Sequence, residues 1–321
     1  MLSVVIPAFD REREIRRAIE SCLAQEDADF EVIVVDDGSR DGTASVVAEY
    51  AGRGVRLLRH PANLGSSPAR ATGLAAARGD WIVRLDSDDE LLPGALRKVQ
   101  HCTSNASENV GRIGLMYRYV DGRVSPFPPP SGRPLDYEGF IAWLENSEMY
   151  DSLTVTRRSS LEEVPMPAGR LMEFLHHLDF ARRFETVWMP EAGATYHVDA
   201  GRRLSRSAPT REEGRQTLEE VDAILERHGE ALRRLAPRFH AAQRRRRVVA
   251  LALLGERARA MSEARRQLKL DPLSMLQWAA LVCVVLGERP LSLALRIKWW
   301  LVEERRKRMC RPRSLAPSST S

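Results

Sequence analysis

Residues 30–43 carry the clearest structural signal in the sequence. They read Phe30-Glu-Val-Ile-Val-Val-Asp-Asp-Gly-Ser-Arg-Asp-Gly-Thr43, an apolar run that ends abruptly at an acidic turn. A continuous apolar run of this length is typical of a strand buried on both faces. The pattern recurs in Trp81-Ile-Val-Arg-Leu-Asp-Ser-Asp-Asp89, and a shorter β-branched run, Leu2-Ser-Val-Val-Ile6, begins the chain and is closed by Pro7.

Helices are predicted between these strands. Apolar residues recur at helical spacing within residues 12–25, and the pattern predicts further helices over 43–50 and 68–77 and a strand over 55–58. This alternation predicts an α/β fold in which helices cover both faces of a mainly parallel sheet. After Pro209 the pattern becomes helical, beginning with the capping-box sequence Thr210-Arg-Glu-Glu213, and we expect helices nearly to Met309.

Composition is that of an ordinary globular protein. The chain has 321 residues, of which 43% are hydrophobic and 29% charged, and its 20 Gly and 18 Pro show no collagen-like period. The net charge of +5 conceals an acidic body and a basic C-terminal part, because residues 241–321 hold 18 basic and 6 acidic residues. We expect three segments: residues 1–105, residues 106–206, and a basic helical extension over 207–321.

The compartment and the surface partners follow from cysteine usage and from the C-terminal part. Four cysteines lie far apart without a Cys-x-x-Cys pair and no secretory signal is evident, so we expect a cytoplasmic protein, free or on the inner face of the membrane. The apolar run 273–286 is shorter than the roughly 20 residues that span a bilayer. Residues 291–302, with Trp299-Trp300 and a following basic cluster, fit either a helix on an anionic membrane surface or a helical bundle with a solvated end. Nucleic acid is disfavoured as a partner, because the block Arg244–Arg247 accompanies no recognisable nucleic-acid fold.

The two acidic clusters directly follow strands, and ligands of open α/β sheets bind at the carboxyl ends of strands. Asp86 and Asp88 are two residues apart, so in an extended chain they share a face and could converge on one divalent cation. Oxygen ligands suit Mg²⁺ or Mn²⁺, which usually complete their shell with substrate phosphates. The structural alternative for either cluster alone is a helix N-terminus capped by aspartate. The sequence lacks a Gly-x-Gly-x-x-Gly motif and a Walker A loop, so it lacks their phosphate cradles.

Four separate motifs carry a resemblance to a known family. In chain order they are Val4-Val-Ile-Pro-Ala-Phe-Asp10, Glu31–Thr43, Asn63-Leu-Gly65 with Ala69-Arg70, and Gly79–Asp89. With these motifs the chain resembles the family 2 inverting glycosyltransferases of the GT-A fold. The resemblance implies that residues 1–105 are the nucleotide-sugar-binding half, and residues 106–206 the acceptor-binding half, of one catalytic GT-A domain. The family more often has Asn where Asp10 and Thr72 stand.

The resemblance implies a role for each matching residue. The donor would be a nucleotide diphosphate sugar, and the Asp-x-Asp motif would hold a metal on its diphosphate. The implied residues are Pro7, Ala8 and Phe9 in the base pocket, Asp37 on the base or ribose, Arg70 on the nucleotide, and Asp86 and Asp88 on the metal and diphosphate, with Asp89 beside them.

An inverting transfer also needs a carboxylate that takes the proton of the acceptor hydroxyl. The resemblance places this base at the start of a helix in the second half, although the family's Glu-Asp pair is absent. Glu173 in Met172-Glu-Phe-Leu is the best candidate. Asp179 is the competitor, six residues further along, where a helix would point it to a different face.

Histidines and arginines in the second half offer weaker candidates. His176 and His177 are adjacent, so on a helix their side chains diverge, and packing roles are favoured over a metal pair. His197 follows a segment that resembles the family's late strand, where it could add a metal ligand or simply end an edge strand. Arg202, Arg203 and Arg206 could contact the diphosphate or form a solvated basic loop.

Together these observations predict a metal-dependent inverting glycosyltransferase that moves a sugar to a carbohydrate or lipid-linked acceptor, in polysaccharide or glycolipid synthesis. One alternative is a non-catalytic sugar-nucleotide-binding or scaffold protein that docks through its basic helical part. A phosphotransferase with a nucleophilic Asp is a weaker alternative, because it gives no role to the Asp36-Asp37 cluster.

Overall fold

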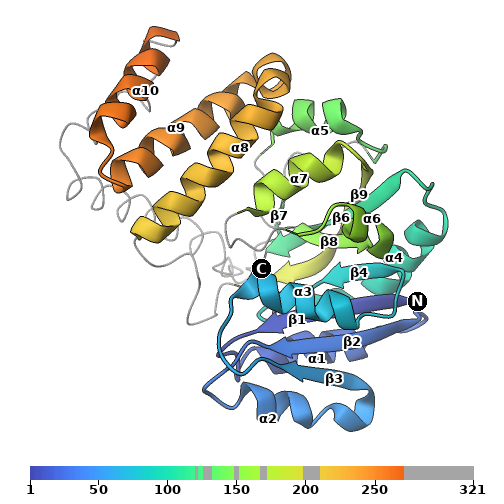
Figure 1. Ribbon diagram of the computed structural model, residues 1–321. Coiled ribbons are helices and arrows are strands. Elements are labelled where there is room, and N and C mark those ends of the chain that lie inside the picture. Colours follow the sequence, from blue (N-terminus) through green and yellow to red (C-terminus); the bar gives the residue numbers. More distant parts are fainter. Residues whose placement is uncertain (120–121, 126–131, 148–151, 167–171, 198–209, 271–321) are drawn as a thin grey trace, which may run out of the picture.

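The computed structural model describes residues 1–119, 122–125, 132–147, 152–166, 172–197 and 210–270, without the side chains of 269 and 270. Within these residues one nine-stranded sheet runs through both predicted halves of the catalytic domain (Figure 1). Its strand order is β3-β2-β1-β4-β8-β6-β9-β5, with β7 paired to β6.

The first half of the sheet is parallel, as the alternation of strands and helices predicts. It consists of β1 (Leu2–Ala8), β2 (Phe30–Asp36), β3 (Val55–Arg59) and β4 (Trp81–Arg84). β1 lies in the middle, pairing with β2 on one side and with β4 on the other. The predicted α/β fold is confirmed.

Helices cover both faces of this half, because alternate residues of β1 face opposite layers. Leu2, Val4 and Ile6 pack in one buried cluster with α1 (Ile15–Leu23) and α4 (Ala95–Ser104). The same cluster includes Val47 of α2 (Thr43–Ala48), and Arg53 of the short 3₁₀ helix η1 (Ala51–Arg53) bonds to Glu20 of α1. On the opposite face Val5 packs with α3 (Ser66–Ala76) and with Leu161 of α6 (Arg158–Glu163).

The second half of the sheet is mixed in direction. β8 (Ser152–Arg157) lies antiparallel between β4 and β6 (Val110–Tyr119), and β9 (Glu185–Tyr196) runs parallel to β6. The two-residue strand β7 (Val124–Ser125) extends β6. The short strand β5 (Glu90–Leu91) pairs with the end of β9, so that the chain after the second acidic turn lies beside residues 194–195.

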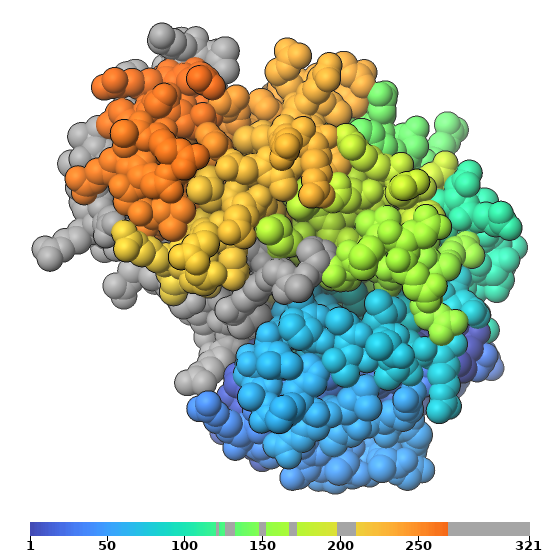
Figure 2. All heavy atoms as spheres, viewed as in Figure 1, coloured from blue at the N-terminus to red at the C-terminus, as the bar shows by residue number. Residues whose placement is uncertain are grey.

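The remaining helices pack on the second half of the sheet and on one another. They are α5 (Tyr137–Leu144), α7 (Glu173–Ala181), α8 (Arg211–Leu235), α9 (Pro237–Leu253) and α10 (Arg257–Leu270). The predicted capping box is present, with Thr210 and Glu213 bonding reciprocally at the start of α8. α5, α7 and α8 share a buried apolar cluster, and Figure 2 shows α8–α10 gathered away from the N-terminal strands and helices.

In the C-terminal part of the described chain, the basic block Arg244–Arg247 forms ion pairs with neighbouring helices. Arg244 pairs with Glu263, Arg246 with Glu220 and Arg247 with Asp222, so three arginines join α9 to α8 and α10. The runs 273–286 and 291–302 lie outside the described residues. Among the helices that are described, none has both the length and the apolarity needed to cross a membrane.

Candidate active site

The two acidic turns lie at one edge of the sheet. β2 and β4 both run parallel to β1, with Ala8 opposite Asp36 and the Leu85 N–H donating to the Val5 carbonyl at 3.2 Å. The carboxyl ends of these three strands therefore meet, as ligand sites of such sheets require. This edge holds Pro7, Ala8 and Phe9 at the end of β1, Asp37 after β2 and Asp86 after β4.

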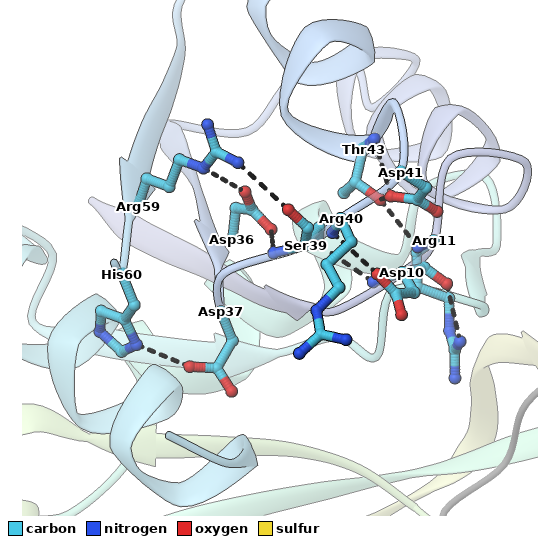
Figure 3. A network of polar contacts seen from close by, with 10 residues as sticks. All are labelled: Asp10, Arg11, Asp36, Asp37, Ser39, Arg40, Asp41, Thr43, Arg59 and His60. Carbon is cyan, nitrogen blue, oxygen red and sulfur yellow. Dashed lines mark hydrogen bonds and ion pairs between the residues drawn. The ribbon is translucent and has the colours of Figure 1, made fainter. Parts of the chain in front are cut away.

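Asp36 and Asp37 hold loops together (Figure 3). Asp36 is fully buried, accepts from the Ser39 N–H at 3.0 Å and pairs with the Arg59 Nε at 3.0 Å. The Oδ1 atom of Asp37 lies 2.7 Å from the His60 Nδ1 and accepts from the Leu64 N–H, while Oδ2 accepts from the Gly65 N–H at 2.7 Å. The first acidic cluster thus ties the Asn63-Leu-Gly65 motif to β2, and the predicted contact of Asp37 with base or ribose stays a prediction.

The structure shows why Asp suits position 10, where the family more often has Asn. Asp10 has a φ of 51°, in the left-handed region where Asn and Asp are enriched. Its Oδ1 accepts from the Arg40 N–H at 3.0 Å, a contact that an Asn oxygen could also make. Thr72, at the other departure from the family pattern, bonds to His60 through Oγ1 at 2.9 Å.

The Asp86–Asp89 segment is a hydrogen-bonded turn and not the extended chain assumed for it. The Asp89 N–H donates to the Asp86 carbonyl at 3.1 Å. Arg17 of α1 holds this turn by donating to the Asp88 carbonyl at 2.7 Å. Just after α1, the buried Gln25 bridges the Leu92 carbonyl and the Leu96 N–H, which follow the turn.

Asp86 and Asp88 fit a divalent cation by the chemistry of their donors. Both are carboxylates on one turn, and the Asp86 side chain is 53% exposed, which leaves room for water and phosphate oxygens beside it. His197 follows β9 beside this turn: its Nε2 lies 3.0 Å from a Glu90 oxygen and its N–H faces Asp89 at 3.5 Å. Within the described residues no group of three or more His, Cys, Asp or Glu is arranged to hold a metal ion.

A cavity of about 370 Å³ opens beside Asp86. Arg70, on α3, reaches Asp86 Oδ1 at 3.4 Å and Glu173 Oε2 at 3.6 Å. Arg84, at the end of β4, donates to Glu173 Oε1 at 2.5 Å. The structure therefore brings two residues from the motifs, Arg70 and Asp86, together with the base candidate Glu173 in one pocket.

The electrostatics of this pocket favour the ionised form of Glu173. The positive charge of Arg84 holds the pKa of Glu173 well below its usual value, and Arg70 adds to the effect against the opposing cost of burial. The same ion pair raises the pKa of Arg84, although burial opposes that shift. A carboxylate held this firmly is ionised at neutral pH but is a weak base.

The other candidates in the second half lie elsewhere. Asp179 is in the α7–α8 interface, where it pairs with Arg227 at 2.7 Å and with His228 Nε2 at 3.0 Å. It does not line the pocket that holds Glu173. Arg202, Arg203 and Arg206 are outside the described residues.

His176 and His177 pack against a buried arginine. Arg112 of β6 donates to His177 Nδ1 at 2.6 Å and faces His176 Nε2 at 3.3 Å. An imidazolium has no acceptor atom, so both rings are neutral. Burial, with Arg112 next in importance, lowers the pKa of His176 to about 3.

Sequence reasoning missed most of the pocket lining, including Arg84, Arg112 and Trp188. The signal for the two arginines was present, because each is a charge with apolar neighbours inside a strand, in Trp81-Ile-Val-Arg-Leu85 and Val110-Gly-Arg-Ile113. A charge in such a position needs a partner inside the protein or a ligand. Trp188 had no comparable signal.

The architecture is that expected of the GT-A fold: a sheet that is parallel in its first half, helices on both faces, and acidic turns at the carboxyl ends of its strands. The chain belongs to glycosyltransferase family 2: residues 3–163, half of the chain, match the family described as "Glycosyl transferase family 2". Succinoglycan biosynthesis protein ExoO of Rhizobium meliloti is 41% identical over 122 residues, which are 38% of this chain and 35% of that protein. An uncharacterised protein of Mycobacterium bovis is 30% identical over 207 residues, 62% of this chain and 59% of its own length. The chain thus spans about a third of the first relative and under two thirds of the second.

Solved structures share the fold over nearly the whole chain. S. aureus TarS in complex with UDP-GlcNAc matches with a TM-score of 0.57 and 17% identity, over 96% of this chain and 91% of that one. A mannosyltransferase from Pyrobaculum calidifontis in complex with GDP-Man and Mn²⁺ matches with a TM-score of 0.51 and 18% identity, over 95% and 86%. The GT-A prediction is confirmed.

Proposed function

We propose that the protein is a metal-dependent inverting glycosyltransferase that moves one sugar from a nucleotide diphosphate sugar to an acceptor hydroxyl. One observation carries the proposal: Arg70 bridges Asp86 of the Asp-x-Asp turn and Glu173. The donor's diphosphate and the acceptor's hydroxyl would therefore meet on either side of one guanidinium.

The residues divide the chemistry between them. The Glu173 carboxylate would take the proton of the acceptor hydroxyl while its oxygen attacks the anomeric carbon opposite the leaving diphosphate. Arg70 would stabilise the charge that grows on the diphosphate. Asp86 and Asp88 would hold Mg²⁺ or Mn²⁺, which supplies Lewis-acid stabilisation of the same charge. His197 is a candidate for a further contact at this turn.

The matching proteins support the finer parts of the proposal. The Pyrobaculum calidifontis mannosyltransferase binds GDP-Man with Mn²⁺, TarS binds UDP-GlcNAc, and ExoO is named for succinoglycan biosynthesis. A polysaccharide or glycolipid acceptor fits these names. Contact with an anionic membrane surface through residues 291–308 remains a prediction, because those residues lie outside the described part of the chain.

One observation favours the non-catalytic alternative: the strong Arg84–Glu173 pair weakens the proposed base. A protein that only binds sugar nucleotides would tolerate such a pair. One experiment distinguishes the two functions, because the non-catalytic alternative predicts metal-dependent donor binding without turnover.

The test combines binding and transfer across UDP-, GDP- and dTDP-sugars with Mn²⁺, using acceptor mixtures and proton NMR of the product's anomeric centre. We expect Mn²⁺-dependent binding of one donor class and a product of inverted configuration. Asp88→Ala should abolish both donor binding and transfer while the melting temperature stays close to that of the parent. A retained configuration, or donor binding indifferent to Mn²⁺, contradicts the proposal.

A further inference from the structure

The pocket beside Glu173 carries more positive charge than its own carboxylates neutralise. Arg70 and Arg84 both pair with Glu173, and Arg70 also reaches Asp86, which the proposed function assigns to a cation. Arg112 contributes a third guanidinium to the pocket lining. No ion pair joins Arg112 to a carboxylate anywhere in the described parts of the chain.

Arg112 is buried in surroundings that do not offset its charge. The residue is 6% exposed, its guanidinium lies 4.0 Å from the centre of the Phe180 ring, and its hydrogen-bonding neighbours are the neutral rings of His176 and His177. Burial, together with the nearby charge of Arg84, lowers the pKa of Arg112 to about 9. A buried cation is expected to have a counter-ion.

The unsatisfied polar atoms of this pocket are all donors. The Nε atoms of Arg70, Arg84 and Arg112 and the Nε1 atom of Trp188 are buried without a hydrogen-bond partner. All four residues line the cavity. Buried polar groups are normally paired, so these four donors without an acceptor leave the cavity wall short of acceptor atoms, and a ligand rich in acceptors satisfies them once the side chains turn toward it.

The rest of the lining suits a carbohydrate. The cavity of about 370 Å³ has aromatic walls from Tyr117, Phe140, Phe174 and Trp188, with hydroxyl groups from Ser152, Thr154 and Thr186. Gly114 makes room for the indole, since a Cβ there would lie 2.6 Å from a Trp188 ring atom. Aromatic faces with a few placed polar groups are the usual lining of a small-molecule site.

We infer that this cavity is the acceptor subsite and that the acceptor carries an anionic group, a phosphate or a carboxylate, held by Arg112, Arg84 and the Trp188 indole N–H. Identifying the ligand as the acceptor rests on the proposed function, whereas the anion site itself does not depend on it. The anion competes with Glu173 for Arg84, so acceptor binding loosens the ion pair that weakens the base.

The test titrates the full-length protein with glucose 6-phosphate, glucuronate and uncharged glucose by calorimetry, with EDTA present to exclude binding through a metal ion. We expect at least one of the two anions to bind roughly ten to a hundred times more tightly than glucose, as charge-assisted hydrogen bonds imply. The stronger anion distinguishes phosphate from carboxylate. Equal binding of all three compounds overturns the inference.

Substitutions in the cavity lining test where the anion binds. Arg112→Met and Trp188→Phe should each reduce the preference for the anion, Arg112→Met by tenfold or more. Arg157→Met is the matched control. Arg157 also stacks on an aromatic ring, Trp81, but at the opposite end of β4 from Arg84. An unchanged preference in folded Arg112→Met or Trp188→Phe contradicts the assignment. Asp88→Ala should keep the anion preference and lose only donor binding, so failure of the proposed function would be seen separately.

Discussion

At the scale of single residues, Glu173 and Asp179 compete for the role of base, and their contacts separate them. Glu173 faces the pocket with Arg70 and Arg84, whereas Asp179 is held by Arg227 and His228 between two helices. Glu173→Gln should lower the transfer rate by at least about 10²-fold, the usual contribution of a general base, and leave Mn²⁺-dependent donor binding intact.

Asp179→Asn is the matched control on the same helix. It should lower the melting temperature because Arg227 and His228 lose their carboxylate, but it should leave the transfer rate within a few-fold of the parent. Comparable activity of the parent and Glu173→Gln, or a collapse of activity in folded Asp179→Asn, would reverse the assignment.

Arg84 sets the pH range in which Glu173 is ionised. Because Arg84 is the largest cause of the lowered pKa of Glu173, Arg84→Met should raise that pKa toward its ordinary value of 4.5. A base is active only when deprotonated, so the acidic limb of the pH–rate profile should move to higher pH. Profiles of kcat for the parent, Arg84→Met and the exposed-pair control Arg97→Met would measure the shift, and coincident limbs would exclude the effect.

The same pair has a consequence for stability, with a definite sign. A carboxylate whose folded pKa is depressed stabilises the fold above its unfolded pKa and loses that contribution as pH falls through the folded value. The Glu173 contribution is therefore complete above about pH 4.5 and lost in stronger acid. Arg84→Met should make the melting temperature less dependent on pH in this acidic window.

At the scale of elements, the close approach of α3 to β1 positions Arg70. A Cβ on Gly73 would lie 2.3 Å from Val5 Cγ1, which is buried and β-branched and so has little freedom to move. Gly73→Ala gains about 1 kcal/mol of helix propensity but incurs about 1–3 kcal/mol of overpacking, so we expect a net loss of about 1 kcal/mol and a raised KM for the donor.

Gly229→Ala provides the control for this prediction, since Gly229 lies in α8 and nothing is within 4 Å of its Cβ position. It should stabilise the protein by up to about 1 kcal/mol in urea unfolding. Equal effects of the two substitutions would mean that α3 can shift away from β1 at little cost.

Elements of the first half could be predicted because their signals are local. The apolar runs ending at Asp36 and near Asp86 predict strands, and the parallel register then follows from the helices between them. β8 could not be placed in this way, since its position between β4 and β6 depends on pairing with residues 36 to 76 positions away. The pocket between these strands was missed for the same reason, and with it the role of Arg112.

Local signals also mislead about side chains whose partners are distant in sequence. Asp37 is in a recognisable motif, but its contacts with His60, Leu64 and Gly65 could not be predicted from that motif, and its contact with the base or ribose stays a prediction. The block Arg244–Arg247 reads as a basic surface, yet three of its members pair with acidic residues of α8 and α10. Charge counts along a chain therefore predict surface partners poorly when neighbouring helices can neutralise them.

At the scale of the whole molecule, the C-terminal helices support the proposed base. Glu220 of α8 is 1% exposed, and its Oε1 accepts from the Phe174 N–H at 3.2 Å, at the start of α7 beside Glu173. Its Oε2 pairs with Arg246 of α9 at 2.6 Å. The first N–H groups of a helix lack partners within it, so α8 and α9 together cap the helix that carries Glu173.

Arg246→Met tests this connection. It leaves the Glu220 carboxylate buried without its cation, and breaking a fully buried pair in this way costs about 3–5 kcal/mol. Because Arg246 is 38% exposed, we expect the free energy of unfolding in urea to fall by about 1–3 kcal/mol. The transfer rate should fall as well, since the α7 N-terminus loses a firmly held cap. Arg259→Met, which removes an exposed pair with Glu256, should change stability by less than about 0.5 kcal/mol and leave the rate unaltered. If Arg246→Met is destabilised yet transfers sugar at the parental rate, the helices hold the fold together but do not position Glu173.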